Sequence, residues 1–283
     1  MILPGSASQS LAASLAAELD ARVGPVEYDW FADGELIVRA PFEADHAVVV
    51  ASTVSSDAHV QLLQLQDVAR RHADRVTTVL PYMGYARQDR AFTDGDPVSA
   101  RAMARAISTG TDRVLTVNPH EEAVTDFFDV PCESVDAAGL LADPLPADLT
   151  DPLFLAPDAS ATALAETVSA DYGTGDVDFF EKVRDYDTGE VSLTPSETAV
   201  EGRDVVVVDD IIATGSTMAG AIDHLQDDGV GRVFATCVHP MLAADARTKL
   251  ARAGCEAVYG TDTIERAVSA VSVAPVVAEA LRE

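Results

Sequence analysis

The chain has 283 residues, 48% of them hydrophobic and only 6% aromatic, a composition that predicts a folded protein with one large or two ordinary domains. Its 47 acidic residues face only 19 basic ones, and a net charge of −28 argues against general binding to nucleic acids or membranes, because both carry phosphates. The acids are dispersed along the sequence, which argues against the alternative of a mesophilic protein that binds a basic partner through an acidic face. We expect instead a protein of a halophile, because salt at 1 M screens charges within about 3 Å.

Three cysteines lie far apart, at positions 132, 237 and 255. Their spacing does not fit a close metal-binding motif and their odd number gives no disulfide framework, so the cytoplasm is the expected location. The first residues, MILPGSASQS, lack a basic segment followed by an apolar one, and no run of about 18 apolar residues occurs. We therefore expect no secretion signal and no membrane span.

Short apolar runs recur along the chain and end in polar or glycine-containing turns. Polar residues do not alternate with the apolar ones, which is typical of strands buried on both faces of a parallel sheet. The runs are HAVVVAST, RVTTVLPY, RVLTVN, PLFLAPD, DVVVVDD and RVFATCV.

Segments with helical periodicity lie between several of these runs. Residues 98–107 follow Asp96 and Pro97, which suit a helix cap and a first helical turn. Residues 216–229 are predicted to form another helix, which ends near Gly229 because this position favours a positive φ. The apolar face of this second helix consists of Met218, Ile222 and Leu225.

The alternation of strands and helices predicts an α/β fold with mainly parallel sheets flanked by helices. Residues 142–152, ADPLPADLTDP, carry three prolines among acids and are the predicted connection between two halves. We place the boundary there, which gives an N-terminal domain of residues 1–146 and a C-terminal domain of residues 147–283. Both halves have the βαβ pattern, so a structural duplication is possible.

Residues 205–217, VVVVDDIIATGST, join a predicted buried strand to a helix. Ligands bind at the carboxyl ends of strands in open parallel sheets, and small residues at a helix N-terminus let backbone N–H groups approach a phosphate. Two carboxylates would repel that phosphate unless they face sugar hydroxyls, which favours a ribose 5-phosphate over the alternative of an ordinary capped helix. The predicted binding residues are Asp209, Asp210, Ala213, Thr214, Gly215, Ser216 and Thr217.

The same segment resembles the phosphoribosyl-pyrophosphate signature of the phosphoribosyltransferase superfamily. Residues 31–35, FADGE, look like the FxDGE loop of ribose-phosphate pyrophosphokinases, and residues 81–90, PYMGYARQDR, are similar to their PYxGYARQDR segment. Without the second segment, FADGE would be interpreted as a simple turn. The resemblance implies two similar phosphoribosyltransferase-type domains. It also implies an ATP site formed by Phe31, Asp33, Gly34, Glu35, Arg87 and Gln88.

Two more segments resemble the magnesium-binding motifs of this family. Residues 118–121, NPHE, resemble its DLH motif, which implies that His120 binds Mg²⁺ near ATP, although a histidine after a strand is more often structural. Residues 156–160, APDAS, resemble its PDxGG turn and imply the second magnesium role for Asp158. Both segments depart from the pattern, because Asn118 replaces a common acid and Ser160 replaces a glycine.

Residues 180–184, FEKVR, look like the flexible catalytic loop of the family with its KxR pair. The resemblance implies that Lys182 and Arg184 are catalytic and that Arg184 also contacts the sugar phosphate. On a strand the two side chains would point the same way. The alternative is a solvated hairpin rim.

The resemblance therefore implies a ribose-phosphate diphosphokinase of nucleotide biosynthesis. In its reaction the C1 hydroxyl of ribose 5-phosphate attacks the β-phosphorus of ATP, with Mg²⁺ as cofactor, and gives AMP and phosphoribosyl pyrophosphate. The family also implies a homo-oligomer, a dimer or larger. Two alternatives remain: a phosphoribosyltransferase, against which the ATP segments count, and a non-catalytic regulatory subunit, which the departures at Asn118, Ser160 and Ala213 keep open.

Overall fold

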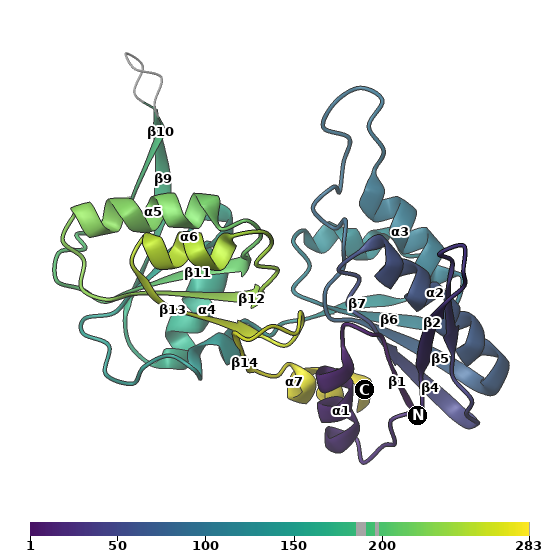
Figure 1. Cartoon of the computed structure of the whole chain (residues 1–283). Coiled ribbons are helices and arrows are strands. Elements are labelled where there is room, and N and C mark those ends of the chain that lie inside the picture. Colours follow the sequence, from purple (N-terminus) through teal and green to yellow (C-terminus); the bar gives the residue numbers. More distant parts are fainter. Residues whose placement is uncertain (185–190, 196–197, 283) are drawn as a thin grey trace. The chain divides into compact units, whose positions relative to one another are not determined.

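The computed structural model describes residues 1–184, 191–195 and 198–282, with the backbone alone for residues 181–184 and 191–195. These residues form two compact units (Figure 1). The first unit consists of residues 1–137, 262–265 and 272–283, and the second of residues 138–261 and 266–271.

This division differs in two respects from the boundary that we placed between residues 146 and 147. Residues 138–146 lie in the second unit, because the short helix η2 (Ala138–Ala142) packs against α4 (Thr162–Tyr172). The end of the chain lies in the first unit, because α7 (Ala274–Arg282) packs against α1 (Gln9–Glu18).

The first unit is built on a five-stranded parallel sheet with the order β1-β4-β5-β6-β7. Its strands are β1 (Ile2–Pro4), β4 (Ala44–Val50), β5 (Ala73–Leu80), β6 (Arg113–Val117) and β7 (Cys132–Val135). The remaining helices of this unit are α2 (Ser56–His72), α3 (Ser99–Ser108) and the 3₁₀ helix η1 (Glu122–Phe127). A separate antiparallel hairpin is formed by β2 (Glu27–Trp30) and β3 (Leu36–Arg39).

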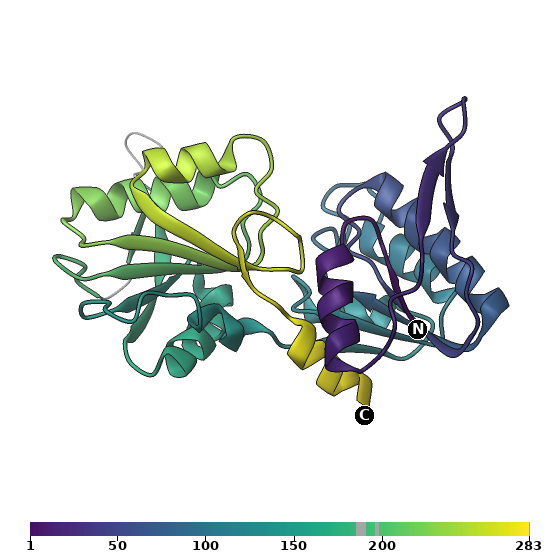
Figure 2. The ribbon, with the colours of Figure 1, turned by 60° about the horizontal axis from the view of Figure 1, so that its bottom comes forward.

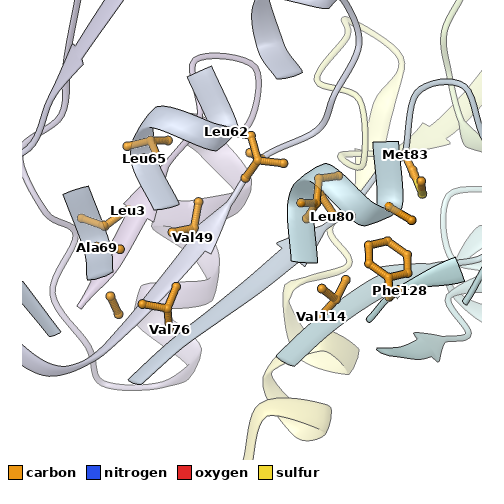
Figure 3. Packing of buried hydrophobic residues seen from close by; sticks show 14 of the residues in the cluster. Leu3, Val49, Leu62, Leu65, Ala69, Val76, Leu80, Met83, Val114 and Phe128 are labelled. Carbon is orange, nitrogen blue, oxygen red and sulfur yellow. The ribbon is translucent and has the colours of Figure 1, made fainter. Parts of the chain in front are cut away.

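Helices cover both faces of this sheet. Side chains of α2 and α3 meet those of the strands in one apolar cluster, where Leu62, Leu65 and Val49 are fully buried (Figure 3). The helices α1 and α7, purple and yellow, lie together on the other face (Figure 2). Strand residues that pack on both faces must be apolar without alternation, as the sequence predicts.

The second unit has a seven-stranded sheet with the order β10-β9-β8-β11-β12-β13-β14, parallel except for the pair β9–β10. Its strands are β8 (Leu153–Ala156), β9 (Asp176–Arg184), β10 (Val191–Pro195), β11 (Val205–Ile211), β12 (Val233–His239), β13 (Cys255–Thr261) and β14 (Ser269–Val271). Its other helices are η3 (Ala159–Ala161), α5 (Ser216–Asp227) and α6 (Ala246–Arg252). Figure 1 shows α5 and α6 over one face and α4 over the other.

The helix predicted at residues 216–229 is confirmed. Its predicted apolar residues are buried in the core with the strands, and Gly229 follows the helix with φ +74°. The cap predicted for the helix at residues 98–107 is wrong. This helix begins at Ser99 after Val98 without a side-chain cap, because the Asp96 carboxylate accepts a hydrogen bond from the Thr93 backbone N–H at 3.0 Å instead.

The three cysteines are free thiols. Among the described residues, no helix is both long and apolar enough to cross a bilayer.

Candidate active site

The loop between β11 and α5 has the geometry of a phosphate cradle. Gly215 stands before the first residue of α5 with φ +68°, and a Cβ atom there would lie 3.3 Å from the Cβ of Ala246. Thr214, Ser216 and Thr217 are exposed around it. The first N–H groups of a helix lack intrahelical acceptors, so this end of α5 presents backbone donors and hydroxyls together.

Three carboxylates gather at the adjoining strand ends. The strands β8 and β11 are parallel neighbours, so Asp158, which follows β8, comes close to Asp209 and Asp210 near the end of β11. Burial raises the pKa of Asp209 above its usual range, and the hydrogen bond and charge of Asp210 and the charge of Asp158 add to this effect. Ionisation of Asp209 is therefore disfavoured by its burial and its acidic neighbours, and hydroxyl donors or a cation bound there would favour the carboxylate.

The position of these acids in the sheet is itself informative. From β8 the chain continues to β9 on one side and later to β11 on the other, so the strand order reverses between β8 and β11. Ligands of open α/β sheets bind at the carboxyl ends of strands where this reversal occurs. The structure therefore brings the residues predicted to bind ribose 5-phosphate, and Asp158, to the end of the sheet where the strand order reverses.

A second loop, residues 240–245, is hydrogen-bonded to the backbone at the start of the phosphate cradle. The backbone N–H groups of Leu242 and Ala243 donate to the carbonyl oxygens of Ile212 and Ala213 at 2.8 and 2.9 Å. Leu242 and Ala244 have positive φ values of 45° and 54°, a conformation that costs energy for a residue with a Cβ atom. No glycine marks the turns of this loop, so its sequence gives no signal of its conformation.

The FADGE segment forms the turn between β2 and β3. The backbone N–H of Phe31 donates to Glu35 O at 2.8 Å, and the N–H of Glu35 donates to the Asp33 carboxylate at 3.2 Å. Gly34 has φ +89° with open space around it, and all five residues are exposed. The turn thus offers an aromatic ring and two carboxylates to solvent.

The segment PYMGYARQDR follows β5 and is fixed by its glycine. A Cβ atom on Gly84 would lie 2.2 Å from Thr53 O, and the Gly84 N–H donates to Thr53 Oγ1 at 2.8 Å. Tyr85 then turns the chain with φ 66° and leaves Arg87 exposed. The Gln88 side chain accepts from Ser99 Oγ at 2.5 Å at the start of α3. Among the described residues, no hydrogen bond or ion pair joins Arg87 or Gln88 to the FADGE turn.

The segment NPHE follows β6. Asn118 has φ 33°, its Nδ2 donates to Asp136 at 2.7 Å, and its Oδ1 accepts from the Ala137 N–H at 2.7 Å. The amide is therefore bound at one end to the Asp136 carboxylate and at the other to the backbone of Ala137, both just after β7, which is a structural role. His120 lies exposed two residues further on.

Asp158 is held by the residue that replaces the glycine of the PDxGG pattern. Its Oδ1 accepts hydrogen bonds from both the backbone N–H and the hydroxyl of Ser160. Within the described parts of the chain, no group of three or more metal-binding side chains forms a metal site.

Lys182 and Arg184 lie on β9, in register with Leu193 and Val191 of β10. On a strand, residues two apart have side chains on the same face, as expected for the KxR pair. The positions of these two side chains lie outside what the structure describes.

Comparisons with known proteins agree with this architecture. Residues 1–110 match the N-terminal domain of ribose phosphate pyrophosphokinase, and residues 136–273 match the phosphoribosyl transferase domain. A ribose-phosphate pyrophosphokinase of Halobacterium salinarum is 62% identical, over 99% of this chain and 100% of that protein. The chain belongs to the ribose-phosphate pyrophosphokinase family.

Two further relatives agree. A ribose-phosphate pyrophosphokinase of Methanopyrus kandleri is 43% identical over 99% of this chain and 98% of that protein. The crystal structure of phosphoribosylpyrophosphate synthetase from Mycobacterium smegmatis superposes with a TM-score of 0.84 at 30% identity, covering 100% of this chain and 97% of that chain. These findings confirm the resemblance, the two phosphoribosyltransferase-type domains and an enzyme that transfers diphosphate groups in nucleotide biosynthesis. The Halobacterium relative also supports a halophilic protein.

Proposed function

We propose that this enzyme transfers the pyrophosphate group of ATP to the C1 hydroxyl of ribose 5-phosphate, with the site residues named above. The reaction yields AMP and phosphoribosyl pyrophosphate. The nucleophile belongs to the substrate, so the protein has to position two anionic substrates and neutralise charge rather than supply a nucleophilic side chain. The single observation that carries the assignment is the meeting of the phosphate cradle with three carboxylates where the strand order reverses.

The phosphate of ribose 5-phosphate binds residues 213–217 in this proposal. The backbone N–H groups at the start of α5 and the hydroxyls of Thr214, Ser216 and Thr217 supply the donors. Asp209 and Asp210 accept hydrogen bonds from the ribose hydroxyls, since a carboxylate accepts from a diol but repels a phosphate. This arrangement separates the acids from the anionic end of the sugar.

ATP binds the first unit in this proposal. Phe31 contacts the adenine ring, while Asp33, Gly34 and Glu35 contact the nucleotide through the FADGE turn. Arg87 donates to phosphate oxygens of ATP. The oxygen of the Gln88 amide already accepts from Ser99 Oγ, so Gln88 binds the base or ribose through its NH₂ group.

Magnesium is the proposed cofactor, with His120 of the first unit as a ligand near ATP and Asp158 of the second unit in the second magnesium role. Mg²⁺ keeps several waters and takes one or two carboxylates plus substrate phosphates, so a site with few protein ligands suits it. Ser160 fixes one oxygen of Asp158, which makes this carboxylate a defined oxygen ligand. When bound, the ion would neutralise charge on the phosphates of ATP. Asn118 is not assigned to either magnesium role, because its amide holds Asp136 and Ala137.

Lys182 and Arg184 are the proposed catalytic residues. Their positive charges stabilise the negative charge on the transferring pyrophosphate group, and Arg184 also contacts the sugar phosphate. The support is their spacing on β9, which places two cations two residues apart on one strand.

The substitution Gly215→Ala tests the phosphate cradle. A Cβ atom at φ +68° and 3.3 Å from Ala246 distorts the loop, so we expect the KM for ribose 5-phosphate to rise about tenfold or more while the KM for ATP changes little. AMP formation in the presence of Mg²⁺ at high KCl is the measurement.

Gly229→Ala is the matched control for that substitution. Gly229 also has a positive φ, of 74°, but it lies at the other end of α5, where the nearest atom would be 3.7 Å from the added Cβ. Both substitutions introduce similar backbone strain. If Gly215→Ala and Gly229→Ala raised the KM for ribose 5-phosphate equally, that result would argue against residues 213–217 as the site. Absence of AMP with the unaltered enzyme at every salt concentration would favour the regulatory subunit instead.

We further propose a homo-oligomer, a dimer or larger, in a reducing cytoplasm. Large hydrophobic residues are exposed on the β2–β3 hairpin and on the neighbouring α2, namely Trp30, Phe31, Val60 and Leu63. Such a group of exposed apolar residues is typical of a protein interface. Light scattering at high KCl measures the mass, and a mass of 29.7 kDa, that of one chain, would contradict the oligomer.

A further inference from the structure

Lys249 stands beside the phosphate cradle, although no motif includes it. Its Nζ lies 3.1 Å from Ser216 Oγ, across from α6 to the first residue of α5. The chain has only two lysines among 283 residues, so a lysine is not a default surface residue here. Its position next to a proposed phosphate-binding hydroxyl needs an explanation.

The two helices that carry this contact are fixed relative to each other. The backbone bonds from Leu242 and Ala243 tie the loop before α6 to residues 212–213 of the cradle, and Ala246 at the start of α6 packs against Gly215. The Asp245 carboxylate accepts from Lys249 Nζ at 2.9 Å, and only a third of the Lys249 side chain is exposed. The ammonium group is thus held at Ser216 from two directions.

In this hydrogen bond only Lys249 can be the donor. An ammonium group has donors and no acceptor, so Ser216 Oγ must accept from Lys249. A hydroxyl carries a single proton and two lone pairs, and the proton of Ser216 therefore remains available to another acceptor. A nearby positive charge also strengthens the hydroxyl as a donor to an anion.

We propose that Lys249 is a positioning residue for ribose 5-phosphate, which acts through Ser216 by directing the hydroxyl proton toward a phosphate oxygen. The inference rests on the proposed function of residues 213–217. It adds a third element, α6, to a cradle that otherwise consists of the β11–α5 loop. In a chain of net charge −28 with only two lysines, it also places an ammonium group beside the proposed phosphate site, where Asp245 holds it in position.

The test compares Lys249→Gln, Lys249→Arg and the control Arg247→Gln. Arg247 is an exposed cation on the same helix but, two residues away, on another face, so its loss removes one positive charge from α6 without touching Ser216. We expect Lys249→Gln to raise the KM for ribose 5-phosphate about tenfold with kcat and the KM for ATP nearly unchanged, because the interaction is made in both the ground state and the transition state. Lys249→Arg keeps a donor and a charge and should retain most of the affinity.

A double-mutant cycle with Ser216→Ala separates positioning from a general charge effect. If Lys249 acts through Ser216, then Lys249→Gln has little further effect on the KM once the hydroxyl is gone, and the two effects are strongly non-additive. Fully additive effects, or a KM for Lys249→Gln that equals that of Arg247→Gln, would overturn the inference. An unchanged KM in Gly215→Ala would overturn the cradle itself, whereas a raised KM there with a silent Lys249→Gln would overturn only the role of Lys249.

Discussion

A single buried carboxylate holds the beginning of two central strands of the second unit. Asp204 accepts from the backbone N–H groups of Thr150 and Arg232 at 2.7 and 2.8 Å, and from the Arg232 guanidinium at 2.7 Å. The side chain of Asp204 is only 5% exposed. A buried charge is tolerated because several donors replace its water, so removing the charge leaves those donors unsatisfied.

The stability of the enzyme should depend on this carboxylate in a pH-dependent way. Burial alone would raise the pKa of Asp204, but the hydrogen bonds and charge of Arg232 and the backbone donors outweigh burial and lower it. A lowered pKa in the folded state means that the stabilisation is present above the ordinary pKa of about 4 and is lost as the pH falls through the folded value. We expect Asp204→Asn to cost about 2–3 kcal/mol of unfolding free energy at pH 7 and less below about pH 4.

Denaturant unfolding at several pH values and constant salt measures this difference. Asp148→Asn is the control, because Asp148 pairs with the same Arg232 at 3.3 Å but is 80% exposed. An exposed pair contributes at most about 1 kcal/mol. Equal losses in the two variants, or a loss for Asp204→Asn that grows toward acid pH, would contradict the role of burial.

At the scale of elements, the C-terminal helix α7 completes the first unit, although it lies at the far end of the chain. The Arg113 guanidinium donates to Ala280 O at 3.1 Å, and the Arg282 guanidinium donates to Glu18 O at 2.6 Å at the end of α1. Val277 is fully buried on the inner face of α7, together with Leu11 and Leu15 of α1. Removing apolar volume from α7 should therefore destabilise a unit that begins at residue 1.

We expect Val277→Ala to lower the unfolding free energy of the first unit by roughly 1–3 kcal/mol, through lost burial and the cavity left behind. Val276→Ala is a matched control with the same change one residue earlier, at a half-buried position. Circular dichroism during urea unfolding, with native hydrogen exchange to locate the effect, is the measurement. Faster exchange confined to the second unit would show that α7 does not stabilise the first.

The sequence predicts those elements whose local pattern and tertiary environment agree. The valines at residues 205–208 are apolar without alternation because the strand is covered on both faces, and α5 combines one apolar face with a glycine just beyond its end. The cap predicted at Asp96 is wrong, because this carboxylate accepts a hydrogen bond from the Thr93 N–H and the helix begins after Val98 without a side-chain cap. Sequence alone gives no rule for that choice.

The candidate site shows the same limit. One short motif predicts the phosphate cradle together with Asp209 and Asp210, since all of them lie within residues 205–217. It does not reveal the loop at residues 240–245, where Leu242 and Ala244 adopt conformations that glycine favours, nor the approach of Lys249 to Ser216 from another helix. Such features depend on how α5 and α6 pack, which tertiary contacts decide.

At the scale of the whole molecule, the two units repeat one plan. In each unit the sheet proceeds strand by strand in chain order on one side, as β4-β5-β6-β7 in the first and as β11-β12-β13-β14 in the second. In the second unit the chain also reverses between β8 and β11, and the three carboxylates gather there. A duplicated fold thus carries different side chains in its two copies, with the proposed nucleotide segments in one and the sugar-phosphate cradle in the other.

Charge acts on the molecule as a whole as well. With 47 acidic and 19 basic residues, the folded chain brings many carboxylates together that are farther apart when it is unfolded. Their mutual repulsion opposes folding, and it weakens as the screening length falls from about 10 Å at 0.1 M salt to about 3 Å at 1 M. The same salt would also reduce the repulsion between this surface and two anionic substrates.

We therefore expect Tm to rise by about 5 °C or more between about 0.1 M and 1 M KCl, because each kcal/mol of relieved repulsion raises Tm by roughly 2–4 °C in proteins of this size. If screening is the cause, NaCl at equal ionic strength acts like KCl, whereas sucrose at equal osmolality acts without changing the screening length. Replacing exposed carboxylates of the second unit, such as Asp223 and Asp227 on α5, by asparagine should flatten the salt dependence of Tm. An unchanged slope in that variant would mean that these acids contribute little to the repulsion. A Tm that falls with added KCl would mean that salt screens attractive rather than repulsive interactions.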